Sequence, residues 1–211
     1  MELYKFKSLS GEGLFYALDM IINERIYLST RDNMNDINEG QWNNQFRITG
    51  PQNKGNLATI EKFKELIDSQ RFTCFVKNIE NQLMWAHYAD GFSGIALQFD
   101  LDDREFDLRE VDYIGIPDIS IEEAEKVISG NVKPQDIGVL KRKDECWHYE
   151  KEWRLFSEET YLNKVKPTQI ILGAKKTKHH SMLETISGKF ELPISYMVPK
   201  SNSEFCIDGE L

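Results

Sequence analysis

The stretch LYKFKSLSGEGLFYALDMIINERIYLS (residues 3–29) decides the fold class, because it joins two strand patterns to one helix pattern. In residues 3–7 the side chains alternate between the two faces of an expected strand. Apolar side chains then recur at helical spacing from Leu14 to Ile22, which predicts an amphipathic helix. Residues 25–29 predict a second strand. This order of elements predicts a domain in which helices and strands share one core.

The remaining periodic segments add strands and helices in no strict alternation. In chain order they are a helix over 57–70, a strand over 71–77, a helix over 83–89, strands over 94–102 and 108–116, a helical region over 118–142 that Gly130 interrupts, a strand over 166–174, a helix over 177–188 and a strand over 191–199. This mixed order predicts an α+β fold. We expect a single domain over residues 1–211, with a central mixed or mostly antiparallel sheet of about six to eight strands flanked by about four or five helices.

The composition is that of an ordinary globular protein and argues against several classes of partner. Apolar residues make up 40% and charged residues 29% of the 211 residues. The 26 Lys and Arg residues are outnumbered by 35 Asp and Glu residues, so the net charge is −9. An acidic chain lacks the broad basic surface of non-specific nucleic-acid binding. No apolar run approaches the ~20 residues of a membrane span, so we expect no membrane partner.

Cysteine usage and the N-terminal residues predict a cytoplasmic location. Cys74, Cys146 and Cys206 are an odd number at irregular spacing, which argues against a disulfide framework and against a zinc knuckle. The first ten residues, MELYKFKSLS, contain no apolar region of the kind that secretory signals carry.

The stretch WHYEKEWRLF (residues 147–156) is the first candidate for chemistry. In a strand, Glu150, Glu152 and Arg154 would share one face, with the two carboxylates about 7 Å apart along the strand. Like charges at that separation perturb each other's pKa. In a helix, Glu150 and Arg154 would form a surface ion pair instead. The composition alone favours a structural role, in which Arg154 pairs with one or both glutamates.

The stretch LMWAHYADG (residues 83–91) is the second candidate. His87 is suited to acid–base chemistry, and Trp85 or Tyr88 to stacking on a flat ligand. The structural alternative is that His87 and its aromatic neighbours pack in the core with one satisfied ring nitrogen.

The stretch NMNDINEG (residues 33–40) is the third candidate. Asn35, Asp36 and Glu39 offer oxygen ligands for a divalent cation, but the spacing of an EF-hand loop is absent. We therefore favour an Asx-turn here and predict no metal site. The chain also lacks the phosphate-binding loop, the dinucleotide-binding glycines, the nucleophile elbow and the H-E-x-x-H pattern.

Several motifs, taken in order, resemble a known bacterial family. They are L-Y-K-F at 3–6, N-x-N-D-x-x-E-G at 33–40, C-F-V at 74–76, L-M-W-A-H-Y-A-D-G-F-S-G-I at 83–95 and W-H-Y-E-K-E-W-R-L at 147–155. The chain resembles the domain of unknown function 2971 over residues 3–175, which leaves 176–211 as a C-terminal helix–strand extension. Members of that family tend to lie in prophage and defence neighbourhoods. The resemblance therefore implies a toxin or an anti-phage defence effector.

The layout is also similar to that of ADP-ribosyltransferase-like domains, which implies NAD as a substrate. By that similarity Glu152 would be the catalytic glutamate and Glu150 would orient the acceptor. Lys5 stands where such transferases carry a His or Arg that clasps NAD, and Val76 where related sequences favour serine. The similarity gives pocket roles to Tyr27 and Ser29, which would line the nicotinamide pocket, and to Trp85, His87 and Tyr88, which would close it.

Three hypotheses follow for the function. The first is an enzyme that cleaves or transfers from NAD or a similar nucleotide, with a protein or nucleic acid as acceptor and with a partner protein in a defence or toxin–antitoxin system. The second is a non-catalytic sensor of a nucleotide or a protein, and the third is a metal-dependent hydrolase using Asp36, Glu39 and Glu150. The candidate site comprises Glu152, Glu150 and His87 as catalytic residues, and Lys5, Tyr27, Ser29, Asn35, Asp36, Glu39, Trp85, Tyr88 and Arg154 as substrate-binding residues.

Overall fold

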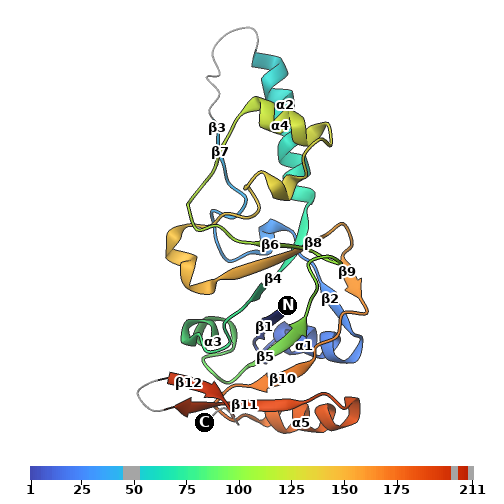
Figure 1. Cartoon of the computed structure of the whole chain (residues 1–211), viewed down its shortest axis with the longest axis vertical. Helices are drawn as coiled ribbons and strands as arrows, with labels where there is room; N and C mark the ends of the chain where they lie inside the picture. Colours follow the sequence, from blue (N-terminus) through green and yellow to red (C-terminus); the bar gives the residue numbers. More distant parts are fainter. Residues whose placement is uncertain (45–52, 201–203, 209–211) are drawn as a thin grey trace.

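The computed structural model describes residues 1–44, 53–200 and 204–208, and an eight-stranded sheet forms its centre (Figure 1). The strands follow the order β12-β11-β10-β5-β1-β4-β8-β6. Their bounds are β1 Glu2–Lys7, β4 Arg71–Val76, β5 Ile95–Asp100, β6 Asp107–Glu110, β8 Glu152–Ser157, β10 Gln169–Leu172, β11 Ile194–Lys200 and β12 Glu204–Ile207. Strands β10 and β11 are parallel, and the other neighbours are antiparallel. The α+β prediction and the mostly antiparallel sheet are confirmed.

Helices and two small strand pairs complete the described part of the chain. The helices are α1 Glu12–Ile22, α2 Asn53–Ser69, α3 Gln82–Tyr88, α4 Ile121–Ile128 and α5 Lys178–Phe190, with single 3-10 segments η1 Arg31–Asn33, η2 Pro134–Asp136 and η3 Glu145–Glu150. The strand pairs are β2 Arg25–Tyr27 with β9 Tyr161–Asn163, and β3 Asn43–Asn44 with β7 Asp118–Ile119. The segment ITGPQNKGN (48–56) is the most linker-like in the sequence, and residues 48–52 of it lie outside the described residues.

The sheet divides into two wings between β1 and β4. Strand β1 pairs with β5 along its whole length, from Glu2 to Lys7, but with β4 only at the register pair Tyr4↔Val76. Strand β4 pairs with β8 along its whole length. The wing β4-β8-β6 therefore diverges from the wing that ends at β1, and Figure 1 shows it rising toward α2 and α4. This divergence creates the space for the cavity described below.

Three hydrophobic clusters hold the wings and helices together. Helices α1 and α5 pack against one face of the wing that ends at β1, around Leu97 and Leu183. Helix α3 covers the opposite face with Trp85, which packs edge-on against Phe6 of β1. Helices α2 and α4 pack against β4 and β8 in a third cluster that contains Phe63. Alternation along each strand accounts for this arrangement, because successive side chains point to opposite faces.

Residues 147–156 form neither a continuous strand nor a single helix, the two alternatives that the sequence left open. The 3-10 segment η3 ends at Glu150, Lys151 adopts a left-handed conformation with φ of 45°, and β8 begins only at Glu152. The Asp144 side chain caps η3 by accepting a hydrogen bond from the backbone N–H of Cys146. Glu150 therefore does not lie on the strand that carries Glu152 and Arg154.

Other segments differ less from expectation. Gly130, with φ of 75°, follows the end of α4, and Pro134 opens only the short η2, so the region 118–142 is not one long helix. The C-terminal extension continues the central sheet, because β11 pairs with β10 and β12 with β11. All three cysteines are free, as the spacing predicted. Among the helices of the described residues, none has the length and apolar character needed to span a membrane.

Candidate functional site

A cavity of about 510 Å³ lies where β1 and β4 diverge. Residues of α1 and β2 line it from one side of the sheet, and residues of α3, η3 and β8 line it from the other. The lining side chains that can bind or react are Lys5 and Lys7 of β1, Tyr16 of α1, Tyr27 of β2, Ser29 and Asn35, Thr73 and Cys74 of β4, Tyr88 of α3, and Lys143, Glu150 and Glu152. A volume of this size falls within the range of about 300–1,000 Å³ that small-molecule sites occupy.

A chain of five buried charges lies beside this cavity, and three of its members, Lys143, Glu150 and Glu152, line it. Glu150 and Glu152 both contact the Lys143 ammonium, at 2.7 and 2.6 Å. The Arg154 Nε lies 2.7 Å from Glu152, and the two terminal nitrogens of Arg154 lie 2.6 and 2.7 Å from the two carboxylate oxygens of Glu39. All five side chains are at most 5% exposed. Three carboxylates against two cations leave one net negative charge when every acid is ionised.

The left-handed residue Lys151 brings the two glutamates together. Because its φ is 45°, the chain turns sharply between η3 and β8, and Glu150 and Glu152 approach the same ammonium. The backbone N–H of Glu152 donates a hydrogen bond of 2.7 Å to the hydroxyl of Tyr113, which fixes the first residue of β8. Alternation along a single strand therefore does not explain why Glu150 and Glu152 lie close together, because only Glu152 is on β8. Glu152 and Arg154 do share a face of β8 and form an ion pair.

The two glutamates have opposite pKa shifts. Burial raises the pKa of Glu150, and its contacts with Lys143 and Tyr88 do not reverse this effect. Burial would also raise the pKa of Glu152, but Arg154 and then Lys143 favour the charged form, and the net shift is downward. Glu152 is therefore ionised at every ordinary pH, whereas Glu150 is the carboxyl group of the pair whose pKa burial shifts upward.

Tyr88 links Glu150 to the 33–40 segment. Its hydroxyl donates a hydrogen bond to Glu150 Oε1 and accepts one from Asn35 Nδ2. Burial and the adjacent Glu150 carboxylate raise the pKa of Tyr88, so the phenol keeps its proton. These contacts place Asn35, Tyr88 and Glu150 in one hydrogen-bonded series at the cavity wall.

Two lysines of β1 supply positive charge to the cavity. The Lys5 ammonium donates hydrogen bonds to Thr73 Oγ1 at 2.6 Å and to the Cys74 carbonyl at 2.9 Å, so it spans the gap between the two wings. Burial, followed by the charge of Lys7, lowers the pKa of Lys5 to about 7. Burial also raises the pKa of the Cys74 thiol, which makes this cysteine a poor nucleophile at neutral pH.

Tyrosine rings form another wall of the cavity. Tyr16 and Tyr27 stack with ring centroids 5.9 Å apart and an interplanar angle of 27°. Tyr161 of β9 meets Tyr27 edge-on at 5.4 Å, outside the cavity lining. The Lys7 ammonium lies 5.4 Å from the Tyr16 ring centroid. A flat ligand can stack on such partly exposed rings.

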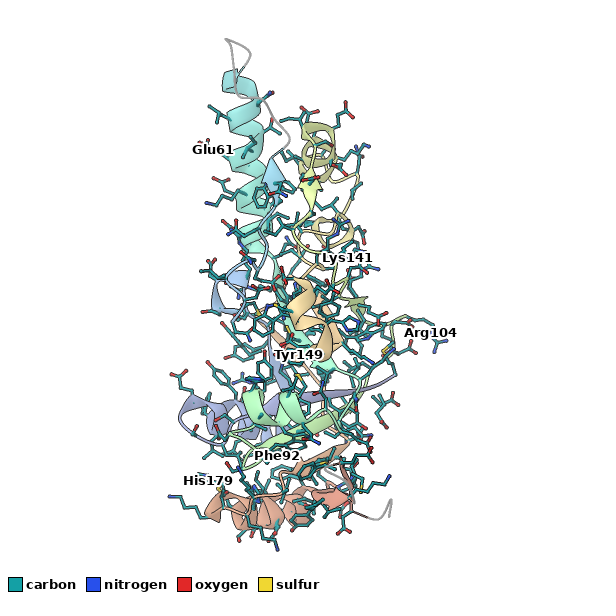
Figure 2. The ribbon with its side chains drawn as sticks, turned by 90° about the vertical axis from the view of Figure 1, so that its left-hand side faces the viewer. Glu61, Phe92, Arg104, Lys141, Tyr149 and His179 are labelled. Carbon is teal, nitrogen blue, oxygen red and sulfur yellow. The ribbon has the colours of Figure 1, made fainter. Side chains whose placement is uncertain are left out.

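Seven of the residues that the sequence singled out line the cavity: Lys5, Tyr27, Ser29, Asn35, Tyr88, Glu150 and Glu152. Of the three aromatic and imidazole side chains expected to close the pocket, only Tyr88 does so. Trp85 is fully buried, and its indole N–H donates to the Ile79 carbonyl at 2.7 Å. His87 is exposed on the outer face of α3, with its ring 6.2 Å from that of Tyr149 on η3; Figure 2 shows Tyr149 beside α3.

Asp36, Glu39 and Arg154 lie outside the cavity lining. Asp36 Oδ1 accepts the backbone N–H of Asn38 at 2.9 Å, which is the Asx-turn favoured from the sequence. Glu39 holds the buried Arg154 guanidinium with both of its oxygens, and Arg154 in turn contacts the cavity-lining Glu152. Within the described ranges, no group of three or more His, Cys, Asp or Glu side chains is arranged to hold a metal ion.

The sequence did not single out Lys143, Lys7 or Tyr16. Lys143 belongs to an irregular segment, and no local pattern marks it as the partner of Glu150 and Glu152. Lys7 did have a signal, because it is two residues from Lys5 on a predicted strand and therefore shares its face.

No curated protein and no solved structure matches the chain. One family model does match, over a segment that runs from α3 into β8 and contains Tyr88, Lys143, Glu150 and Glu152. Residues 84–155 of this chain thus match the family described as protein of unknown function (DUF2971), the family that its sequence motifs resemble.

Proposed function

We propose that this chain is an enzyme that cleaves the N-glycosidic bond of NAD or a similar nucleotide and passes the sugar to water or to an acceptor. The observation that supports this proposal is the pair Glu150 and Glu152, which line one cavity with opposite pKa shifts. Two carboxyl groups whose environments separate their pKa values are suited to two different roles in one reaction.

In the proposed reaction the bond between the ribose and the nicotinamide breaks, and its electron pair leaves with nicotinamide. The sugar then carries oxocarbenium-like positive charge. The net negative charge of the five-residue chain, with Glu152 permanently ionised, stabilises that charge through fixed and buried groups. Such preorganised groups are effective because they need little rearrangement during the reaction.

Glu150 acts as the base in this scheme. Water or an acceptor hydroxyl attacks the sugar carbon, a carbon–oxygen bond forms, and the proton of the attacking group passes to the Glu150 carboxylate. The raised pKa of Glu150 makes its carboxylate a stronger base than an ordinary glutamate. Tyr88 and Asn35 orient the carboxylate through their hydrogen bonds.

The tyrosine wall supports an aromatic ligand in the same cavity. Tyr16 and Tyr27 present stacked rings to the cavity, which are suited to a nicotinamide or a nucleobase. The neighbourhoods in which members of the resembled family lie support a role as a toxin or defence effector, in which NAD consumption would harm the cell. A protein or nucleic-acid acceptor and a partner protein belong to the same proposal.

The test is nicotinamide release from NAD by the purified chain, with Glu150→Gln as the diagnostic variant. Because the environment of Glu150 already favours its neutral form, an amide at this position should keep the fold. We expect at least about a 100-fold loss of rate per folded molecule, which is the usual effect of removing an acid–base group, together with only a modest loss of stability. Glu145→Gln is the matched control, since Glu145 is exposed on the same η3 and does not line the cavity.

A non-catalytic nucleotide sensor is the second candidate, and the completeness of the charge chain favours it. Each carboxylate of Glu39, Glu150 and Glu152 has a cationic partner within 2.7 Å. Under this alternative the five buried charges only stabilise the fold. NAD would then bind to the protein without being consumed. Nucleotide binding without nicotinamide release by the wild-type protein would favour the sensor over the enzyme.

A further inference from the structure

The cationic side chains that line the cavity are not equally neutralised. Four such groups line it: Lys5, Lys7, Arg25 and Lys143. Arg25 pairs with Asp19 at 2.9 Å, and Lys143 pairs with Glu150 and Glu152. Within the described ranges, Lys5 and Lys7 have no carboxylate at ion-pair distance: Lys5 is held by a hydroxyl and a carbonyl, and Lys7 lies over the Tyr16 ring.

We propose that Lys5 and Lys7 form a subsite for the phosphate groups of the ligand, with a diphosphate as the chemical class that fits best. The identity of the ligand as a nucleotide rests on the function proposed above. The anion site itself rests on the unneutralised pair of ammonium groups inside the cavity.

The spacing of the two lysines suits a diphosphate. They are two residues apart on β1 and so point to the same side, about 7 Å apart along the strand. One ammonium can therefore contact each end of a linked pair of phosphates. Lys5 adds a neighbouring donor, because the Thr73 hydroxyl accepts from Lys5 and keeps its own hydrogen for the ligand.

The position along β1 agrees with the proposed reaction centre. Glu152 is opposite Val76, and Val76 is opposite Tyr4, so the carboxylate lies level with the point where the two wings meet. Lys5 and Lys7 follow Tyr4 along β1 into the gap. A ribose beside Glu152 would thus direct its phosphate toward the lysines.

The electrostatics also favour a small buried anion over a polyanion. Burial lowers the pKa of both lysines, which reflects the cost of two neighbouring charges with little water around them. A bound dianion removes that cost and forms charge-assisted hydrogen bonds. The net charge of −9 opposes the approach of a long nucleic acid, so the ligand we infer is a nucleotide-sized phosphate.

Isothermal titration with inorganic pyrophosphate at pH 7 tests the subsite without any turnover. We expect binding by the wild-type chain and an affinity weakened about tenfold or more in Lys7→Met, which keeps the apolar stem of the side chain. Lys5→Met should weaken binding similarly, and Lys7→Met carries the test by itself if Lys5→Met fails to fold. The matched control is Lys77→Met, because the Lys77 ammonium lies 4.2 Å from the Trp153 ring centroid, outside the cavity lining.

Three results would overturn the subsite: no pyrophosphate binding by the wild-type chain, an unchanged affinity in Lys7→Met, or an equal loss in Lys77→Met. Failure of the proposed reaction gives a different pattern. Pyrophosphate binding that depends on Lys7, without nicotinamide release, would contradict the enzyme and support the subsite. Nicotinamide release without pyrophosphate binding would contradict the subsite and support the enzyme.

Discussion

Glu150 and Glu152 carry the same functional group two residues apart, and their surroundings give them different properties. Glu152 lies between Lys143 and Arg154, whereas Glu150 has Lys143 and the Tyr88 hydroxyl. Replacing a buried carboxylate that faces two cations leaves uncompensated charge, which costs more than replacing one that shares a single cation. We therefore expect Glu152 to matter more for the stability of the fold, and Glu150 to matter more for the proposed reaction.

The first prediction concerns stability at these two positions. Glu152→Gln should lower the free energy of unfolding by about 3–5 kcal/mol, because Arg154 and Lys143 lose their shared carboxylate. Glu150→Gln should cost about 1–2 kcal/mol, since the amide still accepts hydrogen bonds. Urea denaturation of the two variants measures both values. Equal losses, or a larger loss in Glu150→Gln, would contradict the assignment of the two environments.

The second prediction concerns Lys5 and pH. Its pKa is about 7 in the folded chain and about 10.5 in the unfolded chain, so between these values the unfolded state binds more protons. Folding stability should therefore rise with pH from 7 to 10, by up to about 1.4 kcal/mol per unit and by less if water in the cavity screens the charge. The charged or titratable groups facing Lys5 are Lys7, Cys74 and Glu152.

Lys5→Met should lack this contribution, so its stability relative to the wild-type chain should fall as the pH increases from 7 to 10. Melting temperatures of the two proteins across that range provide the measurement. A constant difference between them would show that the folded-state pKa of Lys5 is not lowered.

At the scale of elements, the junction between η3 and β8 determines the geometry of the site. Lys151 has φ of 45° and ψ of 52°, a conformation that β-branched side chains strongly disfavour. Its conformation directs Glu150 and Glu152 toward one ammonium. A change confined to this backbone position is expected to affect both stability and chemistry.

The third prediction follows from that junction. Lys151→Gly should preserve nicotinamide release, whereas Lys151→Val should lower both the stability, by about 1–2 kcal/mol, and the rate. Lys164→Val is the matched control, because Lys164 also has a positive φ, of 63°, but does not line the cavity. The control should lose stability and keep its rate per folded molecule. A rate in Lys151→Val equal to that of the control would contradict the role of the junction.

The elements differed in how far the sequence could predict them. Strand β1, helix α1 and strand β4 have clear periodicity and were predicted close to their observed bounds. Strands β3, β7 and β9 are two or three residues long and show no period. Segment η3 alternates aromatic and charged residues as a strand would, and the features that make it helical, the Asp144 cap and the turn at Lys151, depend on backbone geometry.

The site depends on contacts between residues that are far apart in the sequence, and local sequence patterns do not predict such contacts. The paired glutamates and Tyr88 were identifiable as chemical groups, whereas the choice between Trp85 and Tyr88 depends on which face of α3 packs on the sheet. Lys143 reaches both glutamates from an irregular segment. Arg154 was correctly paired with Glu152, but its second partner, Glu39, is 115 residues away in the chain.

At the scale of the whole molecule, the cavity exists because two wings of one sheet meet at a single register pair. The bond between Glu39 and Arg154 holds the 33–40 segment against the β4-β8-β6 wing, and this segment supplies Asn35 to the cavity. The assembled site therefore draws on residues that are far apart in the sequence, from Lys5 of β1 to Glu152 of β8. Its proposed chemistry depends on the protonation state of one of them, Glu150.

The pH dependence of nicotinamide release tests the central claim most directly. If Glu150 is the base, the rate of the wild-type chain should fall as the pH decreases through a pKa above 4.5, and this acid limb should be absent from the residual activity of Glu150→Gln. An identical acid limb in both proteins, or no nicotinamide release by the wild-type chain at any pH, would contradict the claim.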